Sequence, residues 1–364
     1  MNNTLTKIIN DSSQKKSVYL TGNNLIANLS ELVKKYVNFE KIILLTDKNI
    51  YHLAGQTVVE ELEKLDKNLI KIFINKKESG KNMRDLKNLI TKILSHKINR
   101  NSTLIALGGG SITDCAGFLA SILLRGIKCV FIPTTLLAMV DAAIGGKNGM
   151  NVTLDNKIIK NMVGTFYQPD LVISDVNLLK TLPDTEIRNG MGEIVKYYIA
   201  FSKPDISVIP SAVEESRANA RLLINLISQC QKIKLAIVKQ DPFDNQGIRE
   251  VLNLGHTVGH ALESVGEGRF SHGEAVSVGI CAIAKVSQQM NLLSEVNKNK
   301  IISLISSVGL PVKAQALDPD EILSALEFDK KDGRLILIKD IGQVIIRDDI
   351  PLSVIKSVIQ EITL

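Results

Sequence analysis

Residues 102–124 read Ser-Thr-Leu-Ile-Ala-Leu-Gly-Gly-Gly-Ser-Ile-Thr-Asp-Cys-Ala-Gly-Phe-Leu-Ala-Ser-Ile-Leu-Leu, and they contain the clearest strand–turn–helix pattern of the first half. An apolar run, Ser102–Leu107, leads into three glycines, and an apolar helical run, Cys115–Leu124, follows them. Such a strand–turn–helix unit is the repeating element of a parallel α/β sheet. The glycines let backbone amides approach a pyrophosphate, and the helix N-terminus adds partial positive charge. The stretch predicts nucleotide binding, although a tight strand-to-helix turn would also explain the glycines.

The same alternation of short β-branched runs and helical patterns extends through the first half of the chain. We predict strands at Lys41–Thr46, Leu69–Ile74, Ser102–Leu107, Ile127–Pro133 and Asp170–Ser174, and helices at Asn24–Tyr36, Val58–Leu65 and Met83–His96. This order is typical of a mostly parallel, doubly wound sheet.

From about Leu179 the pattern becomes helical. We predict helices at Thr185–Phe201, Ser216–Lys239, Leu254–Val265 and His272–Asn291, and a late hairpin in which Arg334–Lys339 and Gln343–Arg347 flank Asp340-Ile-Gly342. The expected organisation is an α/β domain over residues 1–178 and a mainly α-helical domain over residues 179–364.

The composition is that of a globular protein with a balanced charge. The 364 residues are 45% hydrophobic, which is enough for more than one compact core. Lysine and arginine exceed aspartate and glutamate by only six, 44 against 38, and these charges are spread along the chain. The balance favours a small anionic ligand over a nucleic acid partner.

Cysteine usage and hydropathy indicate a cytoplasmic protein. Four widely spaced cysteines lie in apolar surroundings without a CxxC pair: Cys115, Cys129, Cys230 and Cys281. We interpret them as reduced core residues rather than a disulfide framework or a thiolate zinc site. Residues 1–17 are polar, and no run reaches the roughly 18 apolar residues of a membrane helix. No membrane partner is expected.

Three of the five histidines, His256, His260 and His272, fall within seventeen residues. Neutral imidazole is the commonest side-chain metal ligand and a proton carrier near neutral pH. His256 and His260 are four apart on a predicted helix, so both could bind one metal, or one could bind while the other handles protons. Glu193 is a candidate third ligand. For any single histidine, a core position with a hydrogen bond to a carbonyl is the alternative.

Two further stretches place polar groups where ligands bind. Pro133-Thr-Thr135 ends a strand, and the glycine loop Asp141–Gly149 contains Lys147, which could hold a phosphate or lie solvated at the surface. Glu193 and Lys196 are three apart on a helix, a spacing that usually marks a surface salt bridge. Their neighbours here are largely apolar, which argues against that explanation.

Taken in order, these motifs resemble the 3-dehydroquinate synthase family. The matching motifs are Gly108-Gly-Gly-x-x-x-Asp114, Arg125-Gly126, Pro133-Thr-Thr, Asp141 to Lys147, Lys160-Asn161, Thr181-Leu-Pro-x-x-Glu186, Glu193-x-x-Lys196, Gly247-x-Arg249, Leu252-Asn-x-Gly-His-Thr-x-Gly-His260 and His272-Gly-Glu. Each motif is modest alone, but their joint order is specific and covers the chain from Asp47 to Lys330. The resemblance implies a Rossmann-like α/β N-terminal domain and a helical C-terminal domain.

The resemblance also implies an activity. Members of the family are lyases of the shikimate pathway that use NAD and a divalent metal, usually zinc or cobalt. They convert 3-deoxy-D-arabino-heptulosonate 7-phosphate into 3-dehydroquinate and phosphate. Transient oxidation by NAD is followed by β-elimination of phosphate, re-reduction and intramolecular aldol closure of the ring.

The family pattern assigns residues of this chain to three groups. Those matching metal ligands are Glu193, His256 and His272, which leaves His260 either to support a ligand from outside the ligand set or to handle protons. Those matching dinucleotide contacts are Asp47, Asn49, Glu78, Lys81, Gly109, Gly110, Ser111, Asp114, Thr134, Thr135, Lys147, Lys160, Thr181, Leu182 and Glu186. Those matching substrate and catalytic positions are Asp141, Lys147, Asn161, Lys196, Lys234, Arg249, Asn253, His260 and Lys330. Arg125 matches an arginine that reaches the neighbouring subunit's substrate, which implies a homodimer.

Some features depart from the family pattern. The chain carries about four extra residues between Lys147 and Lys160, and about one in the loop Asp241–Arg249, which affects the alignment of Asn161 and Lys234. Gly192 stands where alanine is common, and Lys330, because it follows Asp329, matches the family's lysine better than Lys331 does. Three alternatives remain open: a related sugar phosphate cyclase, a metal-dependent polyol dehydrogenase, and a non-catalytic NAD-binding protein.

Overall fold

The computed structural model describes residues 5–11, 15–74, 81–154, 157–205, 219–329 and 334–364. The chain forms two compact units. Unit 1 comprises Met1–Leu182 together with Leu223–Phe243, and unit 2 comprises Pro183–Leu222 together with Asp244–Leu364. Most of the long helix α8 (Ala220–Gln240), which we expected in the C-terminal part, therefore belongs to unit 1. That residues 1–178 and 179–364 fold as separate domains stays a prediction.

Unit 1 is built on a seven-stranded sheet in the order β1-β2-β9-β6-β5-β3-β4. The strands are β1 (Leu5–Asp11), β2 (Lys16–Gly22), β3 (Ile42–Asp47), β4 (Ile70–Ile74), β5 (Thr103–Gly108), β6 (Lys128–Pro133) and β9 (Leu171–Asp175). β1 runs antiparallel to β2, whereas the other neighbouring pairs are parallel. The five strands predicted from apolar runs form within one residue of their expected bounds.

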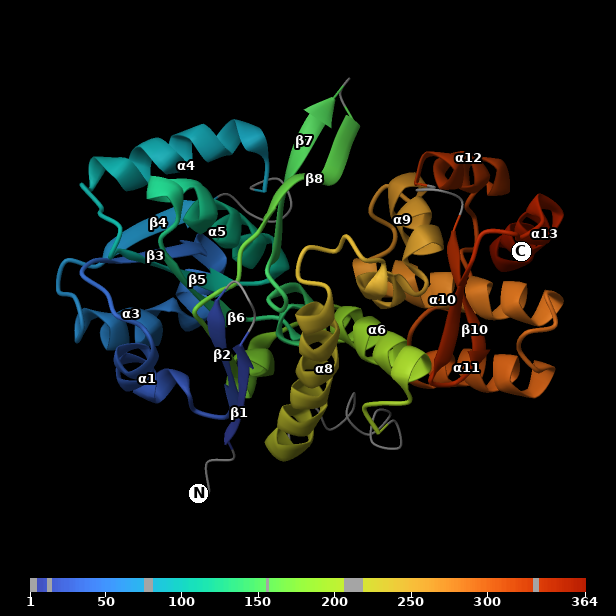
Figure 1. Cartoon of the computed structure of the whole chain (residues 1–364), viewed down its shortest axis with the longest axis horizontal. Helices are drawn as coiled ribbons and strands as arrows, with labels where there is room; N and C mark the ends of the chain where they lie inside the picture. Colours follow the sequence, from blue (N-terminus) through green and yellow to red (C-terminus); the bar gives the residue numbers. More distant parts are fainter. Residues whose placement is uncertain (1–4, 12–14, 75–80, 155–156, 206–218, 330–333) are drawn as a thin grey trace. The chain divides into compact units, whose positions relative to one another are not determined.

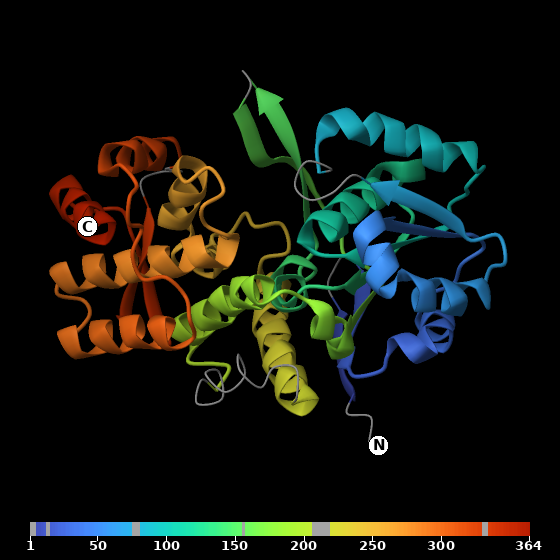
Figure 2. The ribbon, with the colours of Figure 1, turned by 180° about the vertical axis from the view of Figure 1, so that it is seen from behind.

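Helices cover both faces of this sheet (Figure 1 and, from behind, Figure 2). α4 (Met83–Ser95) and α5 (Gly110–Ile122) pack apolar side chains into the core on one face. α1 (Leu29–Tyr36) and α3 (Gln56–Glu63) pack theirs into the core on the other face. The doubly wound sheet is thus confirmed. Short helical turns complete the unit: η1 (Ile26–Asn28), α2 (Lys48–Ile50), η2 (Tyr51–Gly55), η4 (Leu123–Arg125) and η6 (Val176–Thr181).

The strand order creates a switch point between β3 and β5. β4 follows β3 along the chain and pairs on one side of it, whereas β5 pairs on the other side. The helices that follow β3 and β5 therefore cover opposite faces, and the carboxyl ends of these two strands are where a doubly wound sheet opens a ligand crevice. Asp47 ends β3 and Gly108 ends β5, so the predicted glycine turn lies at this point.

The stretch Asp141–Gly149, predicted as a glycine loop, is partly a strand. It spans the end of the turn η5 (Ala138–Ala142) and the start of the antiparallel hairpin β7 (Lys147–Leu154) and β8 (Lys157–Phe166). The buried Asn148 fixes this hairpin, because its Nδ2 donates to the carbonyl oxygens of Gly146, at 2.9 Å, and Tyr167, at 3.0 Å. A polar residue at a buried strand position concealed the strand in the sequence pattern.

Unit 2 is mainly helical, as predicted (Figure 1). The elements of its described residues are α6 (Asp184–Phe201), η8 (Ile248–Asn253), α9 (His256–Val265), α10 (His272–Gln289), α11 (Glu295–Ser307), α12 (Pro319–Asp329), β10 (Leu335–Asp340), β11 (Gln343–Arg347) and α13 (Leu352–Thr363). α10 contacts α6, α9, α11, α13 and β10, so it is the central helix of the unit. The predicted hairpin is present as β10 and β11. Within the described parts of the chain, no helix has both the length and the apolarity to cross a bilayer.

Candidate functional site

The histidine cluster of unit 2 consists of Glu193, His256 and His272. Glu193 lies in the middle of α6, whereas His256 and His272 are the first residues of α9 and α10. The structure brings one ligand atom from each side chain within 4.8 Å of the others. Two imidazole nitrogens and a carboxylate oxygen suit zinc and similar divalent metals, so the donor set fits the metal that the family resemblance implies.

α6 and α10 approach each other closely beside these side chains. Each helix carries a glycine next to its cluster residue, Gly192 on α6 and Gly273 on α10. A Cβ atom on Gly192 would lie 2.5 Å from the carbonyl oxygen of Gly273, and one on Gly273 would lie 2.0 Å from the carbonyl oxygen of Asn189. Asn189 Oδ1 also accepts a hydrogen bond of 2.7 Å from the Gly273 amide. Glycine at position 192 therefore has a physical reason, because it permits this backbone approach.

Residues at the start of α10 determine where this helix begins. Ser271 and Glu274 form a capping box, in which the Glu274 carboxylate accepts from both the backbone amide and the hydroxyl of Ser271 at 2.8 Å. Such a box satisfies amides that the first helical turn leaves without partners. His272 is consequently held at the first position of the helix.

In each cluster histidine one ring nitrogen is held by the protein and the other faces Glu193. Nδ1 of His256 lies 3.2 Å from the carbonyl oxygen of Leu254, which can only accept, so this nitrogen carries the proton. Nδ1 of His272 lies 3.1 Å from Oε2 of Glu263. The two Nε2 atoms lie 3.5 Å and 3.3 Å from Oε1 of Glu193. Both Nε2 atoms and one carboxylate oxygen thus converge.

Burial and charge act differently on the two rings. Burial lowers the pKa of His256 to about 3, against a smaller raising effect of the Glu193 charge, so this ring is neutral at pH 7. Burial also lowers the pKa of His272, but hydrogen bonds and charges from Glu193 and Glu263 outweigh it and raise that pKa to about 10. Lys196 forms an ion pair with Glu193. A divalent cation would supply the positive charge that the His272 proton supplies here and would release that proton.

His260 lies beside the histidine cluster, one turn after His256 on α9. Its ring centroid is 5.4 Å from that of His256, and its side chain is exposed. His260 instead forms a second group with Glu263 and His272, whose ligand atoms also lie within 4.8 Å of one another. Arg249, which is buried, and Asn253, which is exposed, lie on η8 just before α9.

The switch-point cluster of unit 1 consists of residues at or just after the carboxyl ends of β3, β5 and β6: Asp47, Asn49, Gly109, Gly110, Ser111, Thr134 and Thr135. Asp47 Oδ1 accepts from the amides of Asn49, at 2.7 Å, and Ile50, at 2.9 Å. Gly109 is the N-cap of α5 and offers no capping side chain. A Cβ atom on Gly109 would lie 3.1 Å from Cγ2 of Thr135, so the backbone is closely approached here. The start of α5 has the features of an anion site.

Lys81 joins α5 and β8 next to this cluster. Its buried ammonium lies 2.5 Å from Oδ2 of Asp114 on α5 and 2.6 Å from Oδ1 of Asn161 on β8. The family pattern assigned Lys81 and Asp114 to the dinucleotide and Asn161 to the substrate. The structure places the three side chains together.

Asp141 and Lys234, two expected substrate residues, are also neighbours. Lys234 Nζ donates to the backbone carbonyl of Asp141 at 2.9 Å and lies 2.9 Å from its Oδ2. One turn earlier on α8, the fully buried Gln231 donates to the carbonyl of Met139 at 3.1 Å and accepts from the Thr21 hydroxyl at 3.0 Å. Sequence reasoning missed Gln231, whose signal was a polar residue on an otherwise apolar helix face.

Two family models match consecutive parts of this chain. The model for the 3-dehydroquinate synthase N-terminal part matches residues 71–189, and that for the C-terminal part matches residues 190–332. A 3-dehydroquinate synthase of Dehalococcoides mccartyi is 36% identical over 94% of this chain and 95% of its own length. One of Rippkaea orientalis is 39% identical over 88% of each chain. The chain belongs to the 3-dehydroquinate synthase family.

A solved cyclase shares the fold of this 3-dehydroquinate synthase family member. 2-Deoxy-scyllo-inosose synthase, solved in complex with carbaglucose-6-phosphate, NAD⁺ and Co²⁺, matches with a TM-score of 0.87 at 25% identity. The match covers 98% of this chain and 100% of that chain. The predicted fold class, a doubly wound α/β part and a helical part, is confirmed.

The other residues expected from the 3-dehydroquinate synthase pattern lie at element ends or on the hairpin. Lys147 begins β7 and Lys160 lies on β8, and both are exposed. Arg125 ends η4, also exposed, and Thr181 ends η6 just before Leu182. In unit 2, Glu186 lies in the first turn of α6 and its Oε2 accepts from Asn189 Nδ2 at 3.2 Å. Glu78, Lys330 and Lys331 lie outside the described residues.

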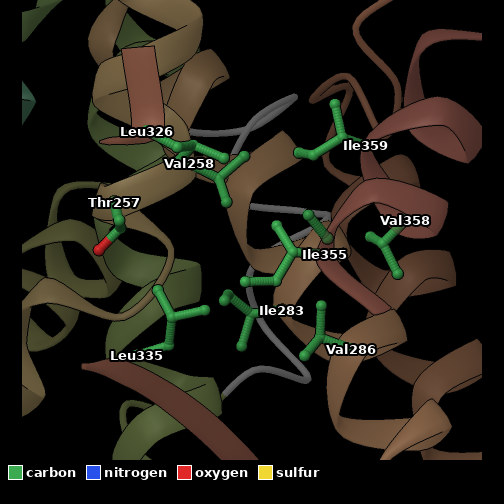
Figure 3. Close-up of a pocket in the computed structure, with 10 residues that line it drawn as sticks. Thr257, Val258, Ile283, Val286, Leu326, Leu335, Ile355, Val358 and Ile359 are labelled. Carbon is green, nitrogen blue, oxygen red and sulfur yellow. The ribbon is translucent and has the colours of Figure 1, made fainter. Parts of the chain in front are cut away.

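Figure 3 shows an apolar cavity of about 20 Å³ in unit 2 of this 3-dehydroquinate synthase relative. It is lined by α9, α10, α12, β10 and α13, and its lining side chains are aliphatic apart from Thr257. A sugar phosphate needs polar and charged partners, which this space lacks. The cavity is therefore a packing feature of unit 2 rather than a substrate site.

Proposed function

We propose that the chain is a 3-dehydroquinate synthase, a phosphorus–oxygen lyase that converts 3-deoxy-D-arabino-heptulosonate 7-phosphate into 3-dehydroquinate and inorganic phosphate. This is the second step of the shikimate pathway, which leads to chorismate and the aromatic amino acids. The observation that carries the proposal is the convergence of Glu193 Oε1 with the Nε2 atoms of His256 and His272. It occurs in a chain related to these synthases over nearly its whole length.

Two cofactors belong to this proposal, NAD and a divalent metal, zinc or cobalt. Glu193, His256 and His272 would hold the metal, since they offer the nitrogen and oxygen donors that it prefers. When bound, the metal supplies a Lewis acid that polarises a substrate oxygen, and NAD supplies a reversible hydride acceptor. His260, exposed beside the cluster, would exchange a proton with the substrate. The solved cyclase with NAD⁺ and Co²⁺ supports both cofactors.

The switch-point cluster would hold the dinucleotide. The start of α5, at Gly109, Gly110 and Ser111, offers backbone amides and the positive end of a helix to the pyrophosphate. Thr134 and Thr135 add hydroxyl groups at the end of β6. The other proposed dinucleotide contacts are Asp47, Asn49, Glu78, Lys81, Asp114, Lys147, Lys160, Thr181, Leu182 and Glu186.

Basic side chains would bind the anionic groups of the substrate. Its phosphate and carboxylate suit charge-assisted hydrogen bonds from Lys147, Lys196 and Arg249. Fixing the phosphate in this way would place it to accept the neighbouring proton before it leaves. The same contacts would orient the opened product for ring closure, which needs mainly proximity. The other proposed substrate residues are Asp141, Asn161, Lys234, Asn253 and Lys330.

A homodimer is the proposed assembly, located in the cytoplasm. Ile122 and Met162 of unit 1 are large apolar residues that remain 39% and 70% exposed, and Ile122 lies three residues before Arg125. Single exposed apolar side chains are common on protein surfaces, so the proposed dimer rests on the match of Arg125 to the family's intersubunit arginine. The four cysteines are buried and none of them forms a disulfide, which is compatible with a reducing compartment.

Mixing two inactive variants tests the shared site. If Arg125 completes the neighbour's site, Arg125→Ala and His272→Ala subunits each fail alone, but a hybrid dimer has one intact site. Random mixing would then restore about a quarter of wild-type activity, because half the dimers are hybrids with one working site of two. Light scattering would give the mass of the particle. A monomer, or a mixture that stays inactive, would exclude the shared site.

The reaction is tested by phosphate release from 3-deoxy-D-arabino-heptulosonate 7-phosphate with NAD and zinc. Added dehydroquinase converts the ring product into an absorbing compound. We expect phosphate and ring product in equal amounts, without accumulation of NADH, because NAD is regenerated in each turnover. NADH accumulation with glycerol or another polyol would favour a dehydrogenase. If neither phosphate release nor NADH accumulation is detected, the chain would be a related cyclase or a non-catalytic protein.

A further inference from the structure

Glu263 contacts the histidine cluster without belonging to the expected ligand set. It lies on α9, two turns after His256, and its side chain is 13% exposed. Its Oε2 lies 3.1 Å from Nδ1 of His272 on α10. The contact therefore joins the two helices that begin with the cluster histidines.

The two ring nitrogens of His272 face different carboxylates. Nε2 is 3.3 Å from Glu193 Oε1, and Nδ1 is 3.1 Å from Glu263 Oε2. A metal on Nε2 needs a lone pair there, so the ring proton must reside on Nδ1 and donate to an acceptor. An ionised carboxylate can only accept, and it also fixes the plane of the ring.

His256 also has an acceptor at Nδ1, but this acceptor is a backbone carbonyl instead of a carboxylate. Its Nδ1 lies 3.2 Å from the carbonyl oxygen of Leu254, so the Nε2 atom is again the one directed toward Glu193. Both histidines thus have an acceptor at Nδ1 and direct Nε2 toward Glu193. This shared arrangement indicates that Nδ1 must be protonated and that Nε2 must face the metal. A charged acceptor at His272 makes its ring the more basic ligand.

We propose that Glu263 is a positioning residue that holds the His272 ring with Nδ1 protonated and Nε2 directed to the metal. The inference rests on the proposed metal site of Glu193, His256 and His272. It concerns the binding of the metal, which is measurable without turnover.

A second cation at His260, Glu263 and His272 is the competing explanation, because their ligand atoms lie within 4.8 Å. Such a cation would need a lone pair on Nδ1 of His272 while Nε2 serves the first metal. The ring would then have to lose both protons, which costs far more than a hydrogen bond from Nδ1 to Glu263. The two explanations predict different stoichiometries, one metal per chain or two.

The test compares metal affinity in the full chain carrying Glu263→Ala, Glu263→Gln or Glu267→Gln. Glu267, an exposed glutamate shortly after α9, is the matched control. Zinc dissociation constants come from competition with a chromophoric chelator, and the visible spectrum of the Co²⁺ form reports ligand geometry. Circular dichroism and the NAD dissociation constant show whether each variant is folded.

We expect Glu263→Ala to weaken zinc binding about 100-fold and to alter the Co²⁺ spectrum. Glu263→Gln should lose only about tenfold, because its amide oxygen still accepts from Nδ1 while the charge is gone. Glu267→Gln should match the wild type. Unchanged affinity and spectrum in folded Glu263→Ala would overturn the proposal, as would two zinc ions per wild-type chain falling to one. A wild type that binds no metal would instead overturn the metal site itself.

Discussion

The two clusters differ in what positions their residues. In unit 1, the residues of the switch-point cluster lie at or just after the ends of β3, β5 and β6, and the hydrogen bonds of the sheet hold these strands side by side. In unit 2, Glu193 and His272 come from helices that meet through a glycine contact. The sheet therefore fixes the positions of residues at its strand ends. The positions of the metal ligands depend instead on how closely two helices can approach each other. The second arrangement should be the more sensitive to single substitutions.

The largest effect is expected from Gly273→Ala. The new Cβ atom would lie 2.0 Å from the carbonyl oxygen of Asn189, which is backbone and cannot rotate away, so α6 and α10 must separate. We expect a loss of about 3 kcal/mol or more in the free energy of unfolding, together with loss of zinc binding. Denaturant unfolding and zinc competition would measure both. The control is Gly268→Ala, which has open space but a φ of 89° and should cost only about 1 kcal/mol. If Gly273→Ala and Gly268→Ala lowered the free energy of unfolding equally, the close approach of α6 and α10 would not explain the effect at Gly273.

His272→Ala should separate the two clusters functionally. Without this ligand we expect zinc affinity to fall by at least about 100-fold and turnover to vanish, whereas NAD affinity should stay within about twofold of wild type. Calorimetry with zinc and with NAD would measure the two affinities. His260→Ala is the comparison, since it should keep the metal while losing activity. A His272→Ala protein that is fully active with metal bound would contradict the ligand assignment.

A smaller effect is expected in unit 1 from Lys81→Met. The variant leaves Asp114 without its 2.5 Å ion pair and Asn161 without its donor. Because Asp114 is partly solvated, we expect a cost of about 2 kcal/mol and about tenfold weaker NAD binding. Thermal unfolding and NAD titration would measure these. Lys15→Met removes the more exposed pair with Asp170 and should cost about 1 kcal/mol or less without affecting NAD. If both variants bind NAD like the wild type, Lys81 has no part in that site.

The smallest effect should come from the cavity of Figure 3, which no residue of either cluster lines. Val286→Ile adds one methyl group to a lining side chain, and filling about 20 Å³ should stabilise unit 2 by about 0.5 kcal/mol. Zinc affinity should not change. Val278 on the same helix is fully buried and does not line this cavity, so Val278→Ile should destabilise by about 1 kcal/mol. Thermal unfolding of the two variants would decide, and a shift of the same sign in both would refute the cavity argument.

The strands could be predicted where burial on both faces leaves a plain apolar run, as in β3 and β5. β1, β2 and the hairpin of β7 and β8 were not predicted from the sequence. β1 alternates exposed and half-buried positions over most of its length, and β7 carries the buried Asn148 and Asn151. The Asn148 amide finds its carbonyl partners only in the folded chain, so its burial could not be foreseen from a hydropathy pattern.

The residues of the candidate site could be predicted less completely than the strands. Spacing alone left the pairing of His256 with His260 open, and the set of Glu193, His256 and His272 followed only from the family resemblance. Glu263 was missed because its contact runs between two helices. Gln231 was missed because its partner Met139 lies 92 residues away, a relation that only tertiary structure creates. Residues that act on neighbours distant in sequence leave little trace in local patterns.

The discontinuity of unit 1 has a consequence for how the protein is made. Leu223–Phe243 supplies unit 1 with Gln231 and Lys234, so the unit lacks part of its structure until residue 243 has left the ribosome. By then α6 of unit 2 has already been synthesised. β2 must likewise wait for β9, with Val18 pairing to Leu171. Contacts of such high sequence separation slow folding, so unit 1 should fold only after Phe243 has been made. A chain cut at Leu182 would lack α8 and expose apolar surface.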